Sequence, residues 1–118
     1  LANLDVSHNP ALEYLYCYSN QLISLDVSQN PALESVFCFS NQLRNLDVSH
    51  NPILAYLHCY SNQLSSLDVS QNPLLESLDC RLNPSLTSLD VSDNTILKEL
   101  RYDTAVNVIG KENTKLPS

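Results

Sequence analysis

Four cysteines are the most reactive side chains of this 118-residue sequence, and each stands 21 residues from the next: Cys17, Cys38, Cys59 and Cys80. An even number of cysteines in an exported protein suggests disulfides. Zinc sites need close pairs such as C-x-x-C, and the sequence has none. If the four stack on adjacent strands, about 4.8 Å apart with parallel side chains, they do not reach the Cβ separation of about 3.8 Å that a disulfide needs. We therefore expect buried, reduced thiols that act as small core residues.

Acidic side chains recur at the same period, each followed two residues later by a serine; they are Asp5, Asp26, Asp47, Asp68 and Asp90. A row of calcium sites is one hypothesis, but calcium takes six to eight oxygens and each repeat offers a single Asp. The alternative is that each Asp and Ser accepts hydrogen bonds from nearby turn amides. We favour the alternative. His58 near Asp79 is the one conceivable catalytic dyad, and we expect no enzyme activity, no cofactor and no metal.

These spacings come from an internal repeat. The segment Leu12–Asn20 (LEYLYCYSN) returns at Leu33–Asn41, Leu54–Asn62 and Leu75–Asn83, with a degraded copy at Leu97–Ala105. A fixed period of this length is typical of a solenoid. Apolar and polar residues alternate within each copy, which predicts a strand. Each coil then sends six side chains into a shared core, for example Leu12, Leu15, Cys17, Leu22, Leu25 and Val27.

Two rows of asparagine mark the corners of the coils: Asn20, Asn41, Asn62 and Asn83, and Asn9, Asn30, Asn51, Asn72 and Asn94. A strand that ends at a corner leaves backbone groups without partners. An amide side chain has both donors and acceptors, so we expect each Asn to bond to backbone groups of adjacent coils. Both rows are interpreted as structural.

The pattern L-x-x-L-x-(L/C)-x-x-N-x-L is the leucine-rich repeat, and it covers residues 1–103. The 21-residue form, with Cys in the strand and LDVS in the other half, resembles bacterial surface repeats of the internalin type, in particular those with a cysteine ladder. It also resembles surface repeats of gut Bacteroidetes. The resemblance implies a right-handed curved coil with a parallel concave β-sheet, a short-stranded or irregular convex side and almost no helix. It also implies an extracellular location, secreted or on the bacterial surface, and binding through the concave sheet.

The two ends of the chain depart from the repeat. Leu1–Asn9 matches Leu22–Asn30, so the chain opens inside a repeat without a polar cap over its core. We therefore expect a piece of a longer protein, with its export signal upstream and with end-to-end self-association through uncapped termini. Residues 104–118 are assigned as a separate C-terminal segment: a closing strand within Thr104–Ile109, then a polar tail or linker over Gly110–Ser118.

Composition excludes two classes of partner. The net charge of −7 does not fit nucleic acid or an anionic membrane surface, because both require a basic footprint. No apolar run is long enough to insert into a bilayer.

The outward face of the Cys-bearing strands is the candidate binding surface. It carries seven of the eight aromatic residues. An exposed apolar patch usually marks an interaction surface, and Tyr suits one well. The competing interpretation is that aromatic residues form strands readily and stabilise the sheet by stacking. The predicted ligand-binding residues are Tyr14, Tyr16, Tyr18, Phe37, Phe39, Tyr56, His58, Tyr60, Asp79 and Arg81.

Three functions fit this face. The first is a non-enzymatic module that binds a protein on a host or neighbouring cell. The second is glycan binding on the same tyrosines, since their ring faces can stack on sugars. The third is a structural spacer that binds nothing.

Overall fold

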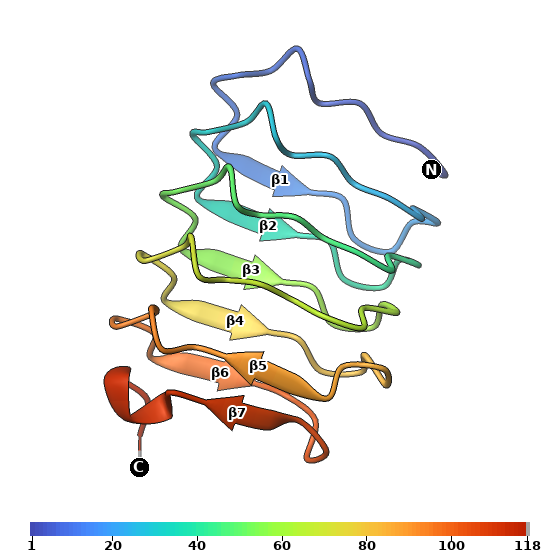
Figure 1. Ribbon diagram of the computed structural model, residues 1–118. Coiled ribbons are helices and arrows are strands. Elements are labelled where there is room, and N and C mark those ends of the chain that lie inside the picture. Colours follow the sequence, from blue (N-terminus) through green and yellow to red (C-terminus); the bar gives the residue numbers. More distant parts are fainter. Residues whose placement is uncertain (118) are drawn as a thin grey trace.

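In the computed structural model, which describes residues 1–117, each repeat forms one coil of a solenoid (Figure 1). The same half of every coil, which carries a cysteine in the first four and Tyr102 in the last, supplies one short strand to a five-stranded parallel sheet. In order across the sheet the strands are β1 (Tyr14–Tyr16), β2 (Ser35–Phe37), β3 (Tyr56–His58), β4 (Ser77–Asp79) and β6 (Glu99–Arg101). This confirms the predicted β-solenoid and the half-repeat assigned to its sheet.

The sheet keeps the repeat in register. Tyr14 pairs with Ser35, one period of 21 residues away, and Ser77 pairs with Glu99, 22 residues away. The longer step reflects the extra residue of the fourth coil, at the Pro84 corner. Because the corner absorbs that residue, equivalent side chains still lie in straight columns across the sheet.

The Asp-Val-Ser halves run back along the other side of the core, mostly as irregular chain (Figure 1). Among the described residues, strands form on this side only near the C-terminus, where β5 (Ser88–Asp90) pairs in parallel with β7 (Asn107–Ile109). A single 3-10 turn, η1 (Lys111–Asn113), is the helical content of residues 1–117. The expected irregular side and near absence of helix are confirmed.

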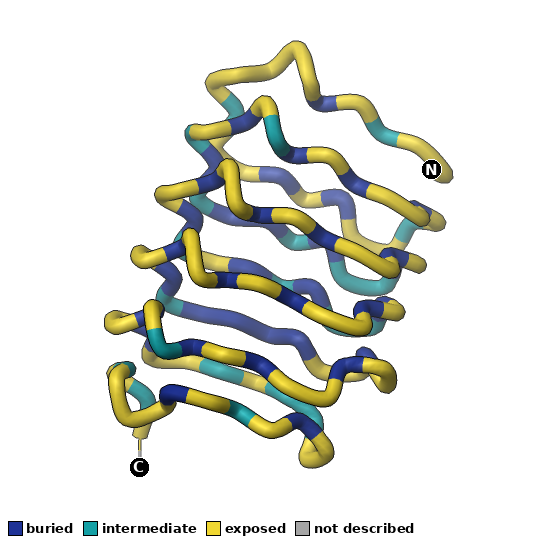
Figure 2. The backbone as a smooth tube through the Cα atoms, viewed as in Figure 1, coloured by how far each residue is buried: buried dark blue, intermediate teal, exposed yellow. Residues whose placement is uncertain are grey.

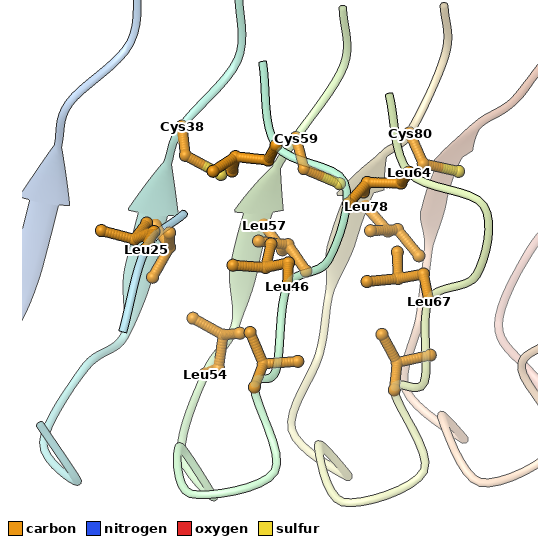
Figure 3. Close-up of a cluster of buried hydrophobic side chains, with 14 of the residues drawn as sticks. Leu25, Cys38, Leu46, Leu54, Leu57, Cys59, Leu64, Leu67, Leu78 and Cys80 are labelled. Atoms are coloured by element: carbon orange, nitrogen blue, oxygen red, sulfur yellow. The ribbon is translucent and has the colours of Figure 1, made fainter. Parts of the chain in front are cut away.

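The core is one continuous cluster of Leu, Val and Cys side chains. Buried positions alternate with exposed ones along both sides of the coils (Figure 2). Leu54, Leu57 and Leu64 of the third coil are completely buried. Figure 3 shows the strand side chain Leu57 beside Leu46, and the strand side chain Leu78 beside Leu67, where Leu46 and Leu67 come from the opposite run of chain. No coil encloses a core alone, so each one depends on its neighbours for burial.

The prediction of a polar tail or linker is wrong for residues 110–117, which fold against the last coil. Gly110 has φ +85°, and a Cβ on it would meet Ser92 at 2.6 Å, so the chain needs glycine to turn here. The Lys115 amide then donates to the Leu97 carbonyl at 2.9 Å, and Leu116 packs against the core. The last coil leaves apolar surface that Leu116 covers. Ser118 lies outside the described residues, and the division after residue 103 stays a prediction.

Candidate functional site

The cysteines form a ladder of free, buried thiols, as predicted. Cys17, in the first complete coil, is 5% exposed, and the other three are fully enclosed. Burial raises the pKa of every thiol, that of Cys80 to about 12. Because the thiolate is the reactive form, these side chains pack rather than act as nucleophiles.

Each Asp of the acidic row caps its own turn, as in the favoured alternative. The amide of the Ser two residues on donates to the carboxylate at 2.9 Å in all five repeats. The Ser hydroxyl also donates to Asp26 and Asp47 at 2.6 Å, and to Asp90. Hydroxyl and amide together lower the pKa of all five carboxyls. Within residues 1–117, no three His, Cys, Asp or Glu side chains are grouped to hold a metal ion.

The two asparagine rows bond across coils, but they are not equivalent. Asn62 donates to the carbonyls of Cys38 and Cys59, and its Oδ1 accepts the Leu43 amide at 3.0 Å. Asn51 donates to the carbonyls of Val27 and Asn30. In its row, the buried Oδ1 atoms have no hydrogen-bond partner in the protein; these are the atoms of Asn30, Asn51, Asn72 and Asn94. Only the Asn62 row therefore satisfies a backbone amide.

The ten predicted ligand-binding residues lie together on the outward side of the five-stranded sheet, which we call the aromatic face. Strand alternation places them there, since Leu15 between Tyr14 and Tyr16 points into the core. Tyr14, Tyr16 and Tyr18 are 46–59% exposed, and Tyr56 is 39% exposed. Ser35 and Ser77 alternate with the tyrosines in one column and are buried.

Two ring stacks cross the aromatic face. In the first, the ring centroids of Tyr16 and Phe37 lie 4.8 Å apart, and those of Phe37 and His58 lie 4.5 Å apart. The second stack contains Tyr18, Phe39 and Tyr60 at 4.6 and 4.4 Å, and Arg81 lies over the Tyr60 ring. Successive rings therefore cover each other's faces. The edges of the rings point outward.

The C-terminal part of the aromatic face is charged. Arg81 forms a two-pronged ion pair with Asp79, with Nε–Oδ1 at 3.0 Å and Nη2–Oδ2 at 2.8 Å. Asp79 is only 4% exposed, although it lies on the outward side of the sheet. The reason is that Arg81 folds over it and leaves its own side chain to solvent. His58 contacts the Ser77 hydroxyl at 3.4 Å, and burial lowers the pKa of its imidazole despite the nearby Asp79.

Two exposed apolar features escaped the sequence analysis. Leu82 is 61% exposed and has φ +56°, a left-handed conformation that the other coils give to Ser. Ile53, Leu74 and Ile96 form a corner ridge and are 39–45% exposed. An alignment of the repeats could have predicted both features. Leu82 occupies a position that is Ser in the other coils, and the ridge residues occupy the position of Ala11 and Ala32.

No helix in residues 1–117 has the length and apolar character needed to cross a bilayer. The sequence matches no protein-family profile. No curated protein sequence matches it either.

Among solved structures, the fold is similar to the functional domain of internalin J from Listeria monocytogenes, which includes a cysteine ladder. The TM-score is 0.74 and the sequence identity is 29% over 89% of this chain. The match spans 28% of the internalin J chain. The fold and the shared cysteine ladder agree with the resemblance found in the sequence.

Proposed function

Because this chain is an internalin-like leucine-rich-repeat solenoid with a cysteine ladder, we propose that it is a non-catalytic module that binds a protein through its aromatic face. The observation that carries the proposal is the exposure of Tyr14, Tyr16, Tyr18 and Tyr56 on one rigid sheet. Large, rigid side chains that combine an apolar ring with a hydroxyl are enriched at protein interfaces. The opposite side of the coil offers Asp and Ser in their place.

Stacking alone does not account for this surface. The two stacks explain why Tyr16, Phe37, Tyr18 and Phe39 contribute to sheet stability. Tyr14 and Tyr56 are outside both stacks and have buried serines as their column neighbours, yet they are 55% and 39% exposed. The spacer function gives no reason for these two rings to be exposed. They are therefore the best single indicators of a binding role.

A protein partner also fits the ring geometry better than a sugar does. A sugar ring packs on an open aromatic face, whereas the six rings of the two stacks cover one another at 4.4–4.8 Å, which leaves Tyr14 and Tyr56 as the tyrosines of the aromatic face outside a stack. Edges, hydroxyls and the Arg81 guanidinium are the groups that point outward, and they suit the side chains and backbone of a protein. Free oligosaccharide that displaced the partner would favour the glycan alternative.

The proposed setting is extracellular, either secreted or on a bacterial surface. The similarity to internalin J supports this location. The absence of enzyme activity is part of the proposal as well. Turnover of any substrate that disappears in His58→Ala would contradict it.

The test is a pull-down from host-cell surface extract that compares the wild type with two variants. Tyr14→Ser/Tyr56→Ser removes exposed rings and leaves both stacks intact. Ile53→Ser/Leu74→Ser is the matched control, because it removes similar apolar exposure, 40% and 45%, from the corner ridge. Circular dichroism and thermal unfolding first establish that both variants are folded.

We expect the aromatic-face variant to lose a partner that the control keeps. A single tyrosine that anchors an interface contributes about 2 kcal/mol or more when truncated, so affinity should fall by at least about 30-fold if one of the two rings is such an anchor. Absence of any retained partner from all three proteins would support the spacer, and equal retention of a partner by all three would place the binding site outside both substituted surfaces. Loss in the control alone would move the binding site to the corner ridge.

A further inference from the structure

Tyr14 and Tyr56 lie on either side of Ser35 on the aromatic face, because β1 and β3 both pair with β2 in register. We propose that the protein partner inserts one arginine side chain between these two rings, over Ser35. The carboxylates of Glu13 and Glu34 would be its counter-ions. The inference rests on the proposed function, since it names the group that a partner brings to this surface.

The spacing of the strands leaves room for one planar group between the rings. Neighbouring strands lie about 4.8 Å apart, so two rings separated by β2 start about 9.6 Å from each other. A cation midway is about 4.8 Å from each, within the distance of about 6 Å at which a cation interacts with a ring face. Among the described residues, no other ring stacks on Tyr14 or Tyr56, so their faces are available.

The floor of this gap is a polar group without a partner. Ser35 is 4% exposed, and it points outward because Val36 beside it is in the core. Its hydroxyl forms no hydrogen bond within residues 1–117, whereas Ser77, at the same position two coils later, contacts His58 at 3.4 Å. A buried hydroxyl usually has a hydrogen-bond partner. A guanidinium above Ser35 would supply the donor.

Two acids lie beside the gap and have no cation of their own. Glu13 and Glu34 occupy the same position in adjacent coils, directly before Tyr14 and Ser35. Their carboxylates raise the pKa of the Tyr14 hydroxyl, that of Glu34 first, and the Glu13 carboxyl is the main cause of a raised pKa at Glu34. The ion pairs of residues 1–117 lie elsewhere and include neither acid. A cation would therefore relieve the repulsion between them.

The aromatic face already contains one site of this kind, formed by the chain's own side chains. The Arg81 guanidinium lies over the Tyr60 ring, 5.6 Å from its centroid. Asp79 holds that guanidinium with two hydrogen bonds. An acid and an aromatic ring therefore fix a guanidinium on this sheet. Between Tyr14 and Tyr56 the rings and the acids are present, and the guanidinium has to come from another molecule.

Arginine fits this gap better than lysine does. Its guanidinium is planar and can enter between two ring faces, and its five N–H donors suffice for two carboxylates and a hydroxyl. The lysine ammonium is a compact, strongly hydrated charge without a flat face. The net charge of −7 favours a basic partner surface in the same way.

The test is an NMR titration of the whole chain with Nα-acetyl-arginine amide. Nα-acetyl-citrulline amide is the matched probe, because it keeps the planar shape and lacks the charge. The arginine probe should shift the ring signals of Tyr14 and Tyr56 and the backbone amide of Ser35 until they saturate. The citrulline probe should leave them in place. Equal binding of Nα-acetyl-lysine amide would overturn the assignment to arginine.

Two variants separate this site from the general acidity of the chain. Glu13→Gln/Glu34→Gln removes the counter-ions and keeps every ring, so it should weaken binding of the arginine probe by about tenfold. Glu99→Gln/Glu112→Gln removes the same charge from exposed positions nearer the C-terminus and should bind like the wild type. Unfolding temperatures close to that of the wild type exclude misfolding. A wild type without saturable shifts, equal shifts with the citrulline probe, or equal weakening in both variants would each overturn the proposal.

The pull-down then separates this inference from the proposed function. We expect Tyr14→Ser/Tyr56→Ser and Glu13→Gln/Glu34→Gln both to lose the partner, and added salt to weaken its binding to the wild type. A partner lost by the Tyr variant and kept at full affinity by the Glu variant would support the aromatic face as the binding surface and overturn the arginine site. A partner kept by both variants would contradict the proposed function and this inference with it.

Discussion

Removal of one asparagine from each row should cost very different amounts of stability, although Asn62 and Asn51 are the same residue type and both are at least 96% buried. Asn62→Ala leaves the Leu43 amide without an acceptor, because Oδ1 at 3.0 Å is its partner. The carbonyls of Cys38 and Cys59 keep a second donor, from Asn41 and Asn83 respectively.

The loss of stability follows from the number of groups left without a partner. A buried amide without an acceptor costs about 1–3 kcal/mol, and the other lost hydrogen bonds add about 1 kcal/mol, so Asn62→Ala should lower the free energy of unfolding by about 3 kcal/mol. Asn51→Ala leaves no backbone group without a hydrogen-bond partner. The Val27 carbonyl still accepts the Asn30 amide, and the Asn30 carbonyl still accepts the Leu33 amide. The substitution also removes a buried, unpartnered oxygen. Its cost should be about 1 kcal/mol.

Urea unfolding followed by circular dichroism measures both costs from the midpoint and the slope. The same side-chain atoms are removed at the two sites, so the difference of about 2 kcal/mol measures the cost of leaving the Leu43 amide without an acceptor. Equal losses, or a larger loss for Asn51→Ala, would refute the reasoning. It would mean that corner cavities rather than hydrogen-bond satisfaction set the cost.

Three further predictions concern thiols, acid and backbone strain. Thiol labelling of the native protein should modify Cys17 first and leave Cys38 and Cys59 unreacted until the protein unfolds. Mass spectrometry can follow the modification of each cysteine, and equal labelling rates would contradict the buried ladder. Acid should destabilise the fold in two stages, because groups with a lowered pKa in the folded state take up protons more readily in the unfolded chain. The first loss of stability comes as the pH falls from the usual His pKa of 6.5 through the lower pKa of His58. The second comes as the pH falls from the usual Asp pKa of 3.8 through the lowered pKa values of the five capping Asp residues. Urea midpoints at pH 7, 5 and 3 test this, and His58→Phe should remove only the first stage. Leu82→Gly should raise the free energy of unfolding by about 0.5 kcal/mol, because glycine adopts the left-handed backbone conformation of Leu82 without strain. Leu82→Ala keeps that strain and should not raise it. Equal urea midpoints for the two variants would contradict the assigned strain.

Periodicity was sufficient to predict the parts of the fold that repeat. Cys17 and its equivalents are enclosed because one sequence position maps to one side of every coil, and the same logic placed Tyr14 and Tyr16 outward. The capping role of Asp26 followed from a Ser two residues away. These features depend on local spacing, which the sequence displays directly.

Features that depend on a single side chain without a repeat equivalent were not predictable. Leu116 packs against the core at the last coil although its sequence context is polar. Asp79 is enclosed because Arg81 bends back over it, and strand alternation contains no information about that rotamer. The unequal asparagine rows likewise depend on where each Oδ1 points. All three are tertiary contacts.

The most direct test of the aromatic face as the binding surface is site-specific photocrosslinking on host-cell surfaces. A benzophenone amino acid would replace Tyr14 or Tyr56 in one pair of proteins and Ile53 or Leu74 in the matched pair, all four sites being 39–55% exposed. The account predicts one shared protein adduct from positions 14 and 56 and none from the corner ridge. Adducts of equal yield from all four positions, or adducts from the ridge alone, would contradict it.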